Sequence, residues 1–218
     1  RYLIIIIFFI LSCSKPNKYS LTGNVNLNDD DKVFLVQMKD NRPVLIDSTS
    51  VVSGEFKFSD SINFPEMHYL FFKKITGNIP FVLEPGNIKI DVYKDSLRSS
   101  KISGTKSNKD WIDYLSETQP YTSELNNIQI EINQSLRLGD SVLIYDLEEQ
   151  FIDMRSKLVD YEFLFMNNRK ESYISALILQ RMIFERSIDY DKADSILNTL
   201  DKTLENTNPY VSVRNIID

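Results

Sequence analysis

The chain has 218 residues, of which 42% are hydrophobic and 26% charged, a balance that suits a globular protein with one large or two small cores. Its net charge of −6 at pH 7 argues against nucleic acid or an acidic membrane surface as a partner, because both attract basic proteins. The single cysteine, Cys13, and the single histidine, His68, exclude an internal disulfide, a CxxC redox pair and a structural zinc site.

The first residues have the features of an export signal. The chain begins at Arg1 rather than Met, so we expect the start of the precursor to lie upstream. Tyr2–Leu11 is an unbroken apolar run that is too short to span a bilayer as a helix, but it fits the hydrophobic core of a signal peptide. The alternatives are a buried β-strand, because Ile and Phe favour strands, and a signal that is not cleaved.

The end of this run, Ile10–Cys13, resembles the lipobox of bacterial lipoprotein precursors, in which a small residue (here Ser12) precedes the cysteine. The resemblance implies that Cys13 is the lipid attachment site and becomes the new N-terminus, with enough acyl chains for stable anchoring. Residues 1–13 would then be the signal peptide and residues 14–19 a polar tether. We therefore expect a protein of the cell envelope, held on the membrane by its lipid and facing the periplasm or the outer-membrane surface.

Residues 20–105 alternate short strand-like runs with turn signals. About eight strands at this spacing predict an antiparallel β-sandwich or a flattened barrel, and the sequence leaves that choice open. Turns are predicted at Asn28–Asp31, Lys39–Pro43, Ser53-Gly54, Gly77-Asn78 and Glu84–Asn87. The strands are expected at Ser20–Leu27, Val33–Met38, Val44–Asp47, Thr49–Val52, Glu55–Phe58, Met67–Lys73, Ile79–Leu83 and Ile88–Tyr93.

Residues 106–218 have a helical period and hold one glycine, Gly139. The fold class predicted for the whole chain is therefore α+β, with a helical bundle after the strands. Ser107 and Asp110 resemble a capping box that opens a first helix, which Pro120 should break. A second helix is expected to carry Leu125, Ile128, Ile132 and Leu136 on one face. A third, capped by Asp140 or Ser141, should run to about Met166, with apolar residues at heptad-like spacing: Leu143, Leu147, Phe151, Met154, Leu158, Tyr161 and Phe165. The remaining helical segments are expected at Ser172–Arg186, Asp191–Leu204 and Tyr210–Ile217.

None of the candidate catalytic or metal-binding residues forms a convincing site. His68 lies in an apolar strand-like run without a nucleophile motif or a second histidine, so we expect a core residue rather than a general base. The acids Asp29–Asp31 are consecutive, which does not match the alternating ligands of a calcium loop and indicates a solvated turn. Asp47 and Glu84 could be read as paired carboxylates, but each is better explained as an acid that stabilises a turn.

The remaining motifs also have plain structural explanations. The aromatic runs Phe71-Phe72 and Tyr161–Phe165 are predicted to be core, and the acids of the third helix (Asp146, Glu148, Glu149 and Asp153) to form a solvated face. The chain has no glycine-rich phosphate loop, which argues against nucleotide binding. We expect no catalytic residue, no metal and no cofactor in this chain.

Several short motifs, in order, resemble a known arrangement of exported Gram-negative lipoproteins. In that arrangement a β-rich domain of unknown function and a helical segment precede a thioredoxin-like domain of the TlpA/AhpC type of thiol-disulfide oxidoreductase. The resemblance covers roughly Tyr19–Asp218. The matching motifs are Leu21–Val25, Val44–Ser48, Gly54–Phe58, Phe81–Ile88, Ile102–Thr105, the helix start at Asn108–Trp111, and the closing Asn208–Val211.

The resemblance implies an active-site CxxC in a thioredoxin-like domain that lies outside this chain, so no catalytic residue can be carried over. The leading hypothesis is a non-catalytic accessory module that spaces or orients such a redox domain or recognises its client protein in the envelope. The alternative is a stand-alone lipoprotein that binds a partner protein or a small ligand through the β-domain, and a glycan is one such ligand.

Overall fold

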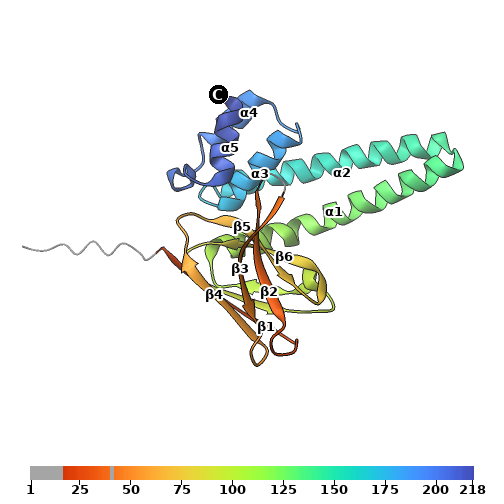
Figure 1. Ribbon diagram of the computed structural model, residues 1–218. Helices are drawn as coiled ribbons and strands as arrows, with labels where there is room; N and C mark the ends of the chain where they lie inside the picture. Colours follow the sequence, from red (N-terminus) through yellow and green to blue (C-terminus); the bar gives the residue numbers. More distant parts are fainter. Residues whose placement is uncertain (1–16, 40–41) are drawn as a thin grey trace, which may run out of the picture.

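The computed structural model describes residues 17–39 and 42–218, which form a pair of four-stranded sheets followed by five α-helices (Figure 1). The predicted α+β class is confirmed. The predicted signal segment, the lipobox and Cys13 lie outside the described residues. No helix within the described residues combines the length and the apolar character that crossing a membrane requires.

The strands form a sandwich rather than a closed barrel. One sheet has the order β4-β1-β7-β8 and the other the order β3-β2-β5-β6. Both sheets therefore keep two edges, which a barrel would not have. The strands are β1 (Lys18–Val25), β2 (Lys32–Lys39), β3 (Arg42–Ser50), β4 (Glu55–Ser61), β5 (Glu66–Phe72), β6 (Ile75–Leu83), β7 (Gly86–Val92) and β8 (Lys101–Ser103).

One strand pair departs from the predicted antiparallel arrangement. β1 and β7 are parallel, with Leu21 opposite Ile88, because the chain returns from the second sheet before it adds β7 beside β1. The alternation of apolar and polar residues is otherwise what buries the core. The inward-facing side chains are almost fully buried and include Leu21, Val33, Leu35, Phe58, Leu70, Phe81 and Ile90.

The turn predicted at Gly77-Asn78 is wrong. Both residues lie inside β6, and the chain reverses at Lys73-Lys74 instead. Gly77 takes a positive φ of 102°, which a glycine can adopt without strain, and the ladder shifts register between Phe71 and Phe72. The glycine therefore serves an irregular stretch within the hairpin rather than its tip.

The helices form one long antiparallel hairpin and one compact group, and Figure 1 shows the hairpin projecting sideways from the body. The hairpin consists of α1 (Lys106–Leu138) and α2 (Ser141–Asn168). The compact group, which lies on one end of the sandwich, consists of α3 (Tyr173–Phe184), α4 (Tyr190–Leu197) and α5 (Asn208–Ile217). Its core continues into the base of the hairpin through Phe165 and Met166.

The predicted break at Pro120 is also wrong, because α1 runs through this residue without interruption. Pro120 cannot donate to the carbonyl of Ser116, but both residues are exposed, so water can satisfy that carbonyl. The hydroxyls of Thr118 and Thr122 bond the carbonyls of Tyr114 and Thr118 at 2.7 and 3.1 Å. Packing against α2 along the hairpin therefore outweighs the local cost of the proline.

Candidate functional site

His68 is a core residue, as the sequence indicates. Its side chain is 2% exposed on β5, its Nδ1 lies 3.2 Å from the carbonyl oxygen of Glu66, and its ring lies beside Phe81. Burial lowers the pKa of His68, so the imidazole is neutral near pH 7. A neutral ring between the two sheets has no access to a substrate.

The three consecutive acids form the predicted turn, but it is not solvated throughout, because Asp29 and Asp30 are exposed whereas Asp31 is buried. The Oδ1 of Asp29 accepts a bond of 2.7 Å from the N–H of Ser53, whereas Asp31 pairs with Lys74 at 2.7 Å. Asp30 takes a positive φ of 69°. Across residues 17–39 and 42–218, no group of three or more His, Cys, Asp or Glu side chains is arranged to hold a metal ion.

Asp47 and Glu84 do not form a carboxylate pair, because β3 and β6 are opposite edges of the same sheet. Asp47 is exposed and bonds the next N–H, that of Ser48, at 2.7 Å. Glu84 follows β6 and accepts from the N–H and the hydroxyl of Ser107, at 2.8 and 2.7 Å. Glu84 therefore caps the first turn of α1 from another element, which replaces the capping box predicted for Ser107 and Asp110.

The junction between the sandwich and the helices is built around Asn108, which the sequence places only at a helix start. Its side chain is fully buried and bonds both backbone groups of Val82, with the amide donating to the carbonyl at 2.7 Å and the oxygen accepting from the N–H at 2.9 Å. The Asn108 amide also donates to the hydroxyl of Thr105 at 2.8 Å. Because β6 is an edge strand, Asn108 takes the place of a further strand.

Two aromatic side chains complete the junction. The indole N–H of Trp111 donates to the carbonyl of Pro80 at 3.4 Å, so α1 covers a second position on the same edge. The buried hydroxyl of Tyr173, on α3, accepts from the N–H of Met67 at 3.2 Å. Val82 itself is fully buried in the core of the helical group. The sandwich and the helices thus share both polar and apolar contacts.

Ion pairs connect α1 and α2 at the base of the hairpin. Arg169, at the end of α2, contacts Asp110 at 2.8 Å and Asp113 at 3.0 Å, and its guanidinium lies over the ring of Phe165. Hydrogen bonds from Lys109 and Arg169 hold the pKa of Asp113 below its ordinary value. The acid predicted to cap α1, Asp110, therefore ties it to α2 instead.

A buried carboxylate lies one turn further along the hairpin. Glu162 is 1% exposed and accepts a bond of 2.6 Å from the hydroxyl of Tyr114 and one of 2.5 Å from Arg181. Arg181 also pairs with Glu185 at 2.6 Å. Because each charge in this network has a partner, the network is better explained as a structural link between α1, α2 and α3 than as a catalytic site.

Two shallow hollows lie on the sandwich. One, of about 610 Å³, lies between β1, β4 and the end of β3 and includes Lys57 and Lys89. The other, of about 770 Å³, lies where β1 and β7 end and the β3–β4 turn begins. In the larger hollow the amide of Asn24 donates to Asp91 at 2.8 Å, and Tyr93 at the rim is 43% exposed.

The other edge of the second sheet stays open to water. β3 carries Val44, Leu45 and Ile46 with 36, 58 and 43% of each residue exposed. Ile46 is unpaired at a register shift, and Pro43 lacks an N–H. The bulge and the proline make this edge a poor template for adding a strand, which explains how its exposed apolar residues can be tolerated.

At the far end of the hairpin, some residues of the predicted apolar helix faces are exposed. Ile128, Ile132 and Leu147 are buried between the helices as expected, but Leu136 and Leu143 are 59 and 43% exposed. The predicted cap of α2 is confirmed, because Asp140 accepts from the N–H of Leu143 at 3.1 Å. The predicted solvated acidic face is confirmed as well, since Asp146, Glu148, Glu149 and Asp153 are all exposed.

Residues 19–111 match the family model described as Domain of unknown function (DUF4369). This stretch covers the sandwich from the second residue of β1 and ends at Trp111, so it includes the start of α1 and the Asn108 contact. The N-terminal domain of unknown function expected from the sequence motifs is therefore present. No curated protein and no solved structure matches the chain.

Replacing Asn108 with alanine should loosen the junction. The change leaves the N–H and the carbonyl of Val82 buried without partners, so we expect a loss of about 2 to 4 kcal/mol in the free energy of unfolding. Urea denaturation measures this loss, and amide exchange at Val82 should speed up. Asn126→Ala, at an exposed position on the same helix, should leave stability within about 0.5 kcal/mol. Equal stability of the two variants would contradict the role of Asn108.

The helical group and the hairpin should lose stability at alkaline pH. Burial raises the pKa of Tyr114 and Tyr173 well above the ordinary value of 10.0. Stability from a raised pKa is fully present below 10.0 and is lost as the pH rises further, because the unfolded tyrosine ionises first. The loss reaches up to about 1.4 kcal/mol per pH unit for each tyrosine.

Urea midpoints measured from pH 7 to 11 test this expectation. The double variant Tyr114→Phe/Tyr173→Phe starts from lower stability at pH 7 but should decline less steeply above pH 10. The matched control is Tyr190→Phe, whose parent residue is 57% exposed, and it should follow the parent protein. An unchanged slope in the double variant would rule out these two residues as the cause.

Proposed function

We propose that this chain is a non-catalytic accessory module of a lipid-anchored envelope protein, in which the sandwich and the helices act as one rigid body that spaces and orients a thioredoxin-like redox domain. Cys13 would carry the lipid, and the residues up to the first strand would be the tether. The order of sequence motifs shared with such lipoproteins motivates the redox connection. The match of residues 19–111 to a domain of unknown function is consistent with the N-terminal domain of that arrangement.

The observation that carries the proposal is the junction. Domains in one chain usually meet through modest polar interfaces and move relative to each other. Here only Gly104 and Thr105 separate β8 from α1, and Asn108, Trp111 and Tyr173 bond strand backbone groups. A body joined in this way transmits a fixed orientation, which is what a spacer requires.

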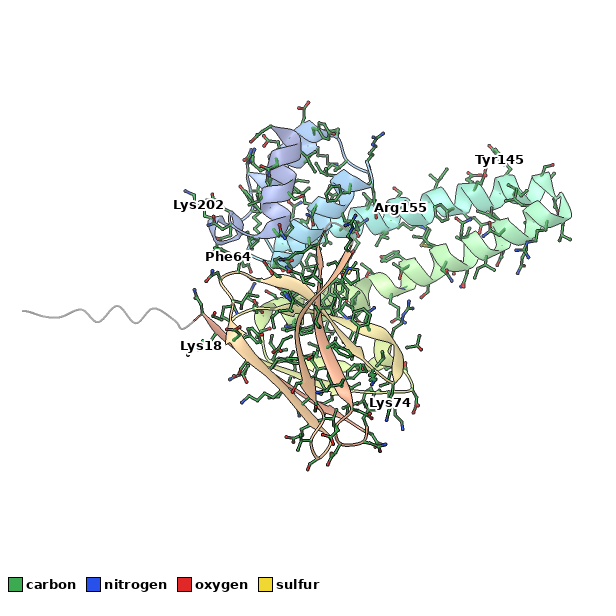
Figure 2. All side chains as sticks on the ribbon, in the orientation of Figure 1. Lys18, Phe64, Lys74, Tyr145, Arg155 and Lys202 are labelled. Atoms are coloured by element: carbon green, nitrogen blue, oxygen red, sulfur yellow. The ribbon has the colours of Figure 1, made fainter. Side chains whose placement is uncertain are left out.

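The two ends of the described chain support the same role. Lys18 begins β1 on one side of the sandwich, whereas Asp218 follows α5 on the helical group (Figures 1 and 2). α5 packs on α3, whose Tyr173 is bonded to β5. The direction in which α5 points is therefore fixed relative to the strand that follows the proposed tether.

Sequencing the encoding DNA in frame beyond the codon for Asp218 tests the redox connection. We expect a thioredoxin-like stretch with a CxxC motif, and the whole product should reduce insulin disulfides whereas residues 14–218 alone should not. A stop codon directly after Asp218 would remove the redox connection for this gene product. Insulin reduction by residues 14–218 alone would contradict the non-catalytic role.

A second candidate is ligand binding by the sandwich, favoured by the larger hollow. It combines an amide, carboxylates and a partly exposed tyrosine ring, which is the chemistry that binds carbohydrate hydroxyls and sugar faces. We expect any glycan bound from a broad panel to be lost in Tyr93→Ala and in Asn24→Ala, and kept in Tyr190→Ala. Absence of binding across the panel, or binding that the hollow variants leave unchanged, would reject this candidate.

A further inference from the structure

We propose that the distal half of the α1–α2 hairpin is a docking arm for a protein partner that presents an apolar surface bordered by Lys and Arg side chains. The docking arm is defined as residues 124–153. This inference goes beyond the accessory role proposed above and does not depend on the redox connection, because it rests on the arm's own surface.

The docking arm stands free of the rest of the protein. Figure 1 shows the hairpin projecting from the body, and Figure 2 places Tyr145 near its far end and Arg155 close to the body. The arm has its own small core of Ile128, Ile132 and Leu147, separate from the cores of the sandwich and the helical group. At 1.5 Å per residue, the arm reaches out by roughly 20 Å. The rest of the described chain therefore leaves its outer faces exposed.

The turn at the end of the arm is tightly specified. Gly139 takes a positive φ of 72° and ends α1, and the N–H of Asp140 bonds the carbonyl of Ser135 at 3.1 Å. The side chain of Asp140 then caps α2 through the N–H of Leu143. A turn fixed at both helix ends presents its neighbouring side chains in a set geometry, which lowers the entropic cost of binding.

Those neighbouring side chains are apolar and exposed. Leu138 is 83% exposed, Val142 74% and Tyr145 70%. Ile152 is 69% exposed and lies on the same face of α2 as Val142 and Tyr145, because positions three and ten residues apart fall close together around a helix. Large apolar side chains exposed along a projecting element are typical of a surface that another protein covers.

The charge of the arm specifies the chemistry of that protein. The arm contains seven Asp and Glu residues and, as its only basic residue, Arg137. Glu148 and Glu149 lie among the exposed apolar residues of α2, and Asp146 and Asp153 lie to one side. Acidic side chains around exposed apolar residues attract a partner surface in which Lys and Arg border an apolar face.

The same charge disfavours the two other occupants. An anionic bilayer would repel the arm, and membrane-binding helices carry Lys and Arg beside their apolar face rather than acids. A second copy would bring seven more acids against the first seven, which costs free energy at moderate ionic strength.

The test uses a synthetic amphipathic helix of Leu and Lys as the probe, with a Leu and Glu helix of equal length beside it. Binding to the full chain is measured by calorimetry at about 50 and 300 mM salt, concentrations that differ strongly in charge screening, and the contact is located by amide chemical shifts. We expect the Leu/Lys helix to change the amide chemical shifts of residues 136–152 and to bind at least about 10-fold more weakly at high salt. The Leu/Glu helix should not reproduce this binding.

Two variants of the arm separate its apolar and charged contributions. Leu138→Gln/Val142→Gln removes exposed apolar side chains, and Glu148→Lys/Glu149→Lys reverses the local charge. Each double variant should weaken binding of the Leu/Lys helix at least about 10-fold. Its helicity and its urea midpoint should stay close to those of the parent protein. Glu205→Lys, an exposed reversal outside the arm, and Leu164→Gln, whose parent residue is 57% exposed near the base of the hairpin, should each leave binding unchanged.

Other outcomes reject the proposal. Equal losses in the arm variants and the controls would mean that the probe senses only the overall acidity of the chain. Binding of the arm to phosphatidylglycerol vesicles would assign it to lipid instead. Dimerisation in sedimentation runs that Leu138→Gln/Val142→Gln abolishes would assign it to a second copy.

Discussion

The architecture depends on strand backbone groups that the second sheet leaves without partners. β6 is an edge strand, so the N–H and carbonyl of Val82 have no neighbouring strand to bond. The pairing of β2 with β5 ends at Val36 and Tyr69, so the N–H of Met67 also has no partner on β2. Leaving such groups buried and unpaired costs about as much as a whole hydrogen bond each. Asn108 and Tyr173 satisfy them, and in doing so they fix α1 and α3 on the sandwich.

The two edges of that sheet differ, because helix α1 covers the β6 edge whereas the β3 edge is exposed to water. On β6, Asn108 and Trp111 cover the edge, and Glu84 just beyond the strand caps α1. On β3, a bulge and a proline blunt an edge that stays in water. The helices therefore attach on one side only, which leaves the long hairpin free to extend away from the body.

A rigid body and a free arm are complementary features for a module without an evident catalytic cluster among its described residues. The junction sets the direction of the hairpin and of α5 relative to the first strand. The arm then offers exposed apolar side chains in an acidic setting at a fixed distance from the body. Both features concern position and contact rather than chemistry, which is consistent with a role in spacing or recruitment.

Short-range patterns in the sequence were sufficient for most of the local structure. The alternating runs are strands, the i, i+3, i+4 stripes are helices, and Gly139 with Asp140 specifies the tight turn of the hairpin, because each of these depends on neighbours within a few residues. His68 lies in the core and Asp29–Asp31 form a turn, as their immediate neighbours predict, but Asp31 is buried against Lys74 rather than solvated.

The tertiary structure decided the features that depend on distant partners. Glu84 caps a helix 23 residues away, and Asn108 completes a strand edge 26 residues before it. The local periodicity of the sequence predicts neither contact. Asn108 stands out in the sequence only because it lies in one of the motifs shared with the exported lipoproteins. Pro120 remains helical because α2 packs along α1. Leu136 and Leu143 fit an apolar stripe but are exposed; in the last turn of α1 the buried position is Ser135, which no apolar pattern marks.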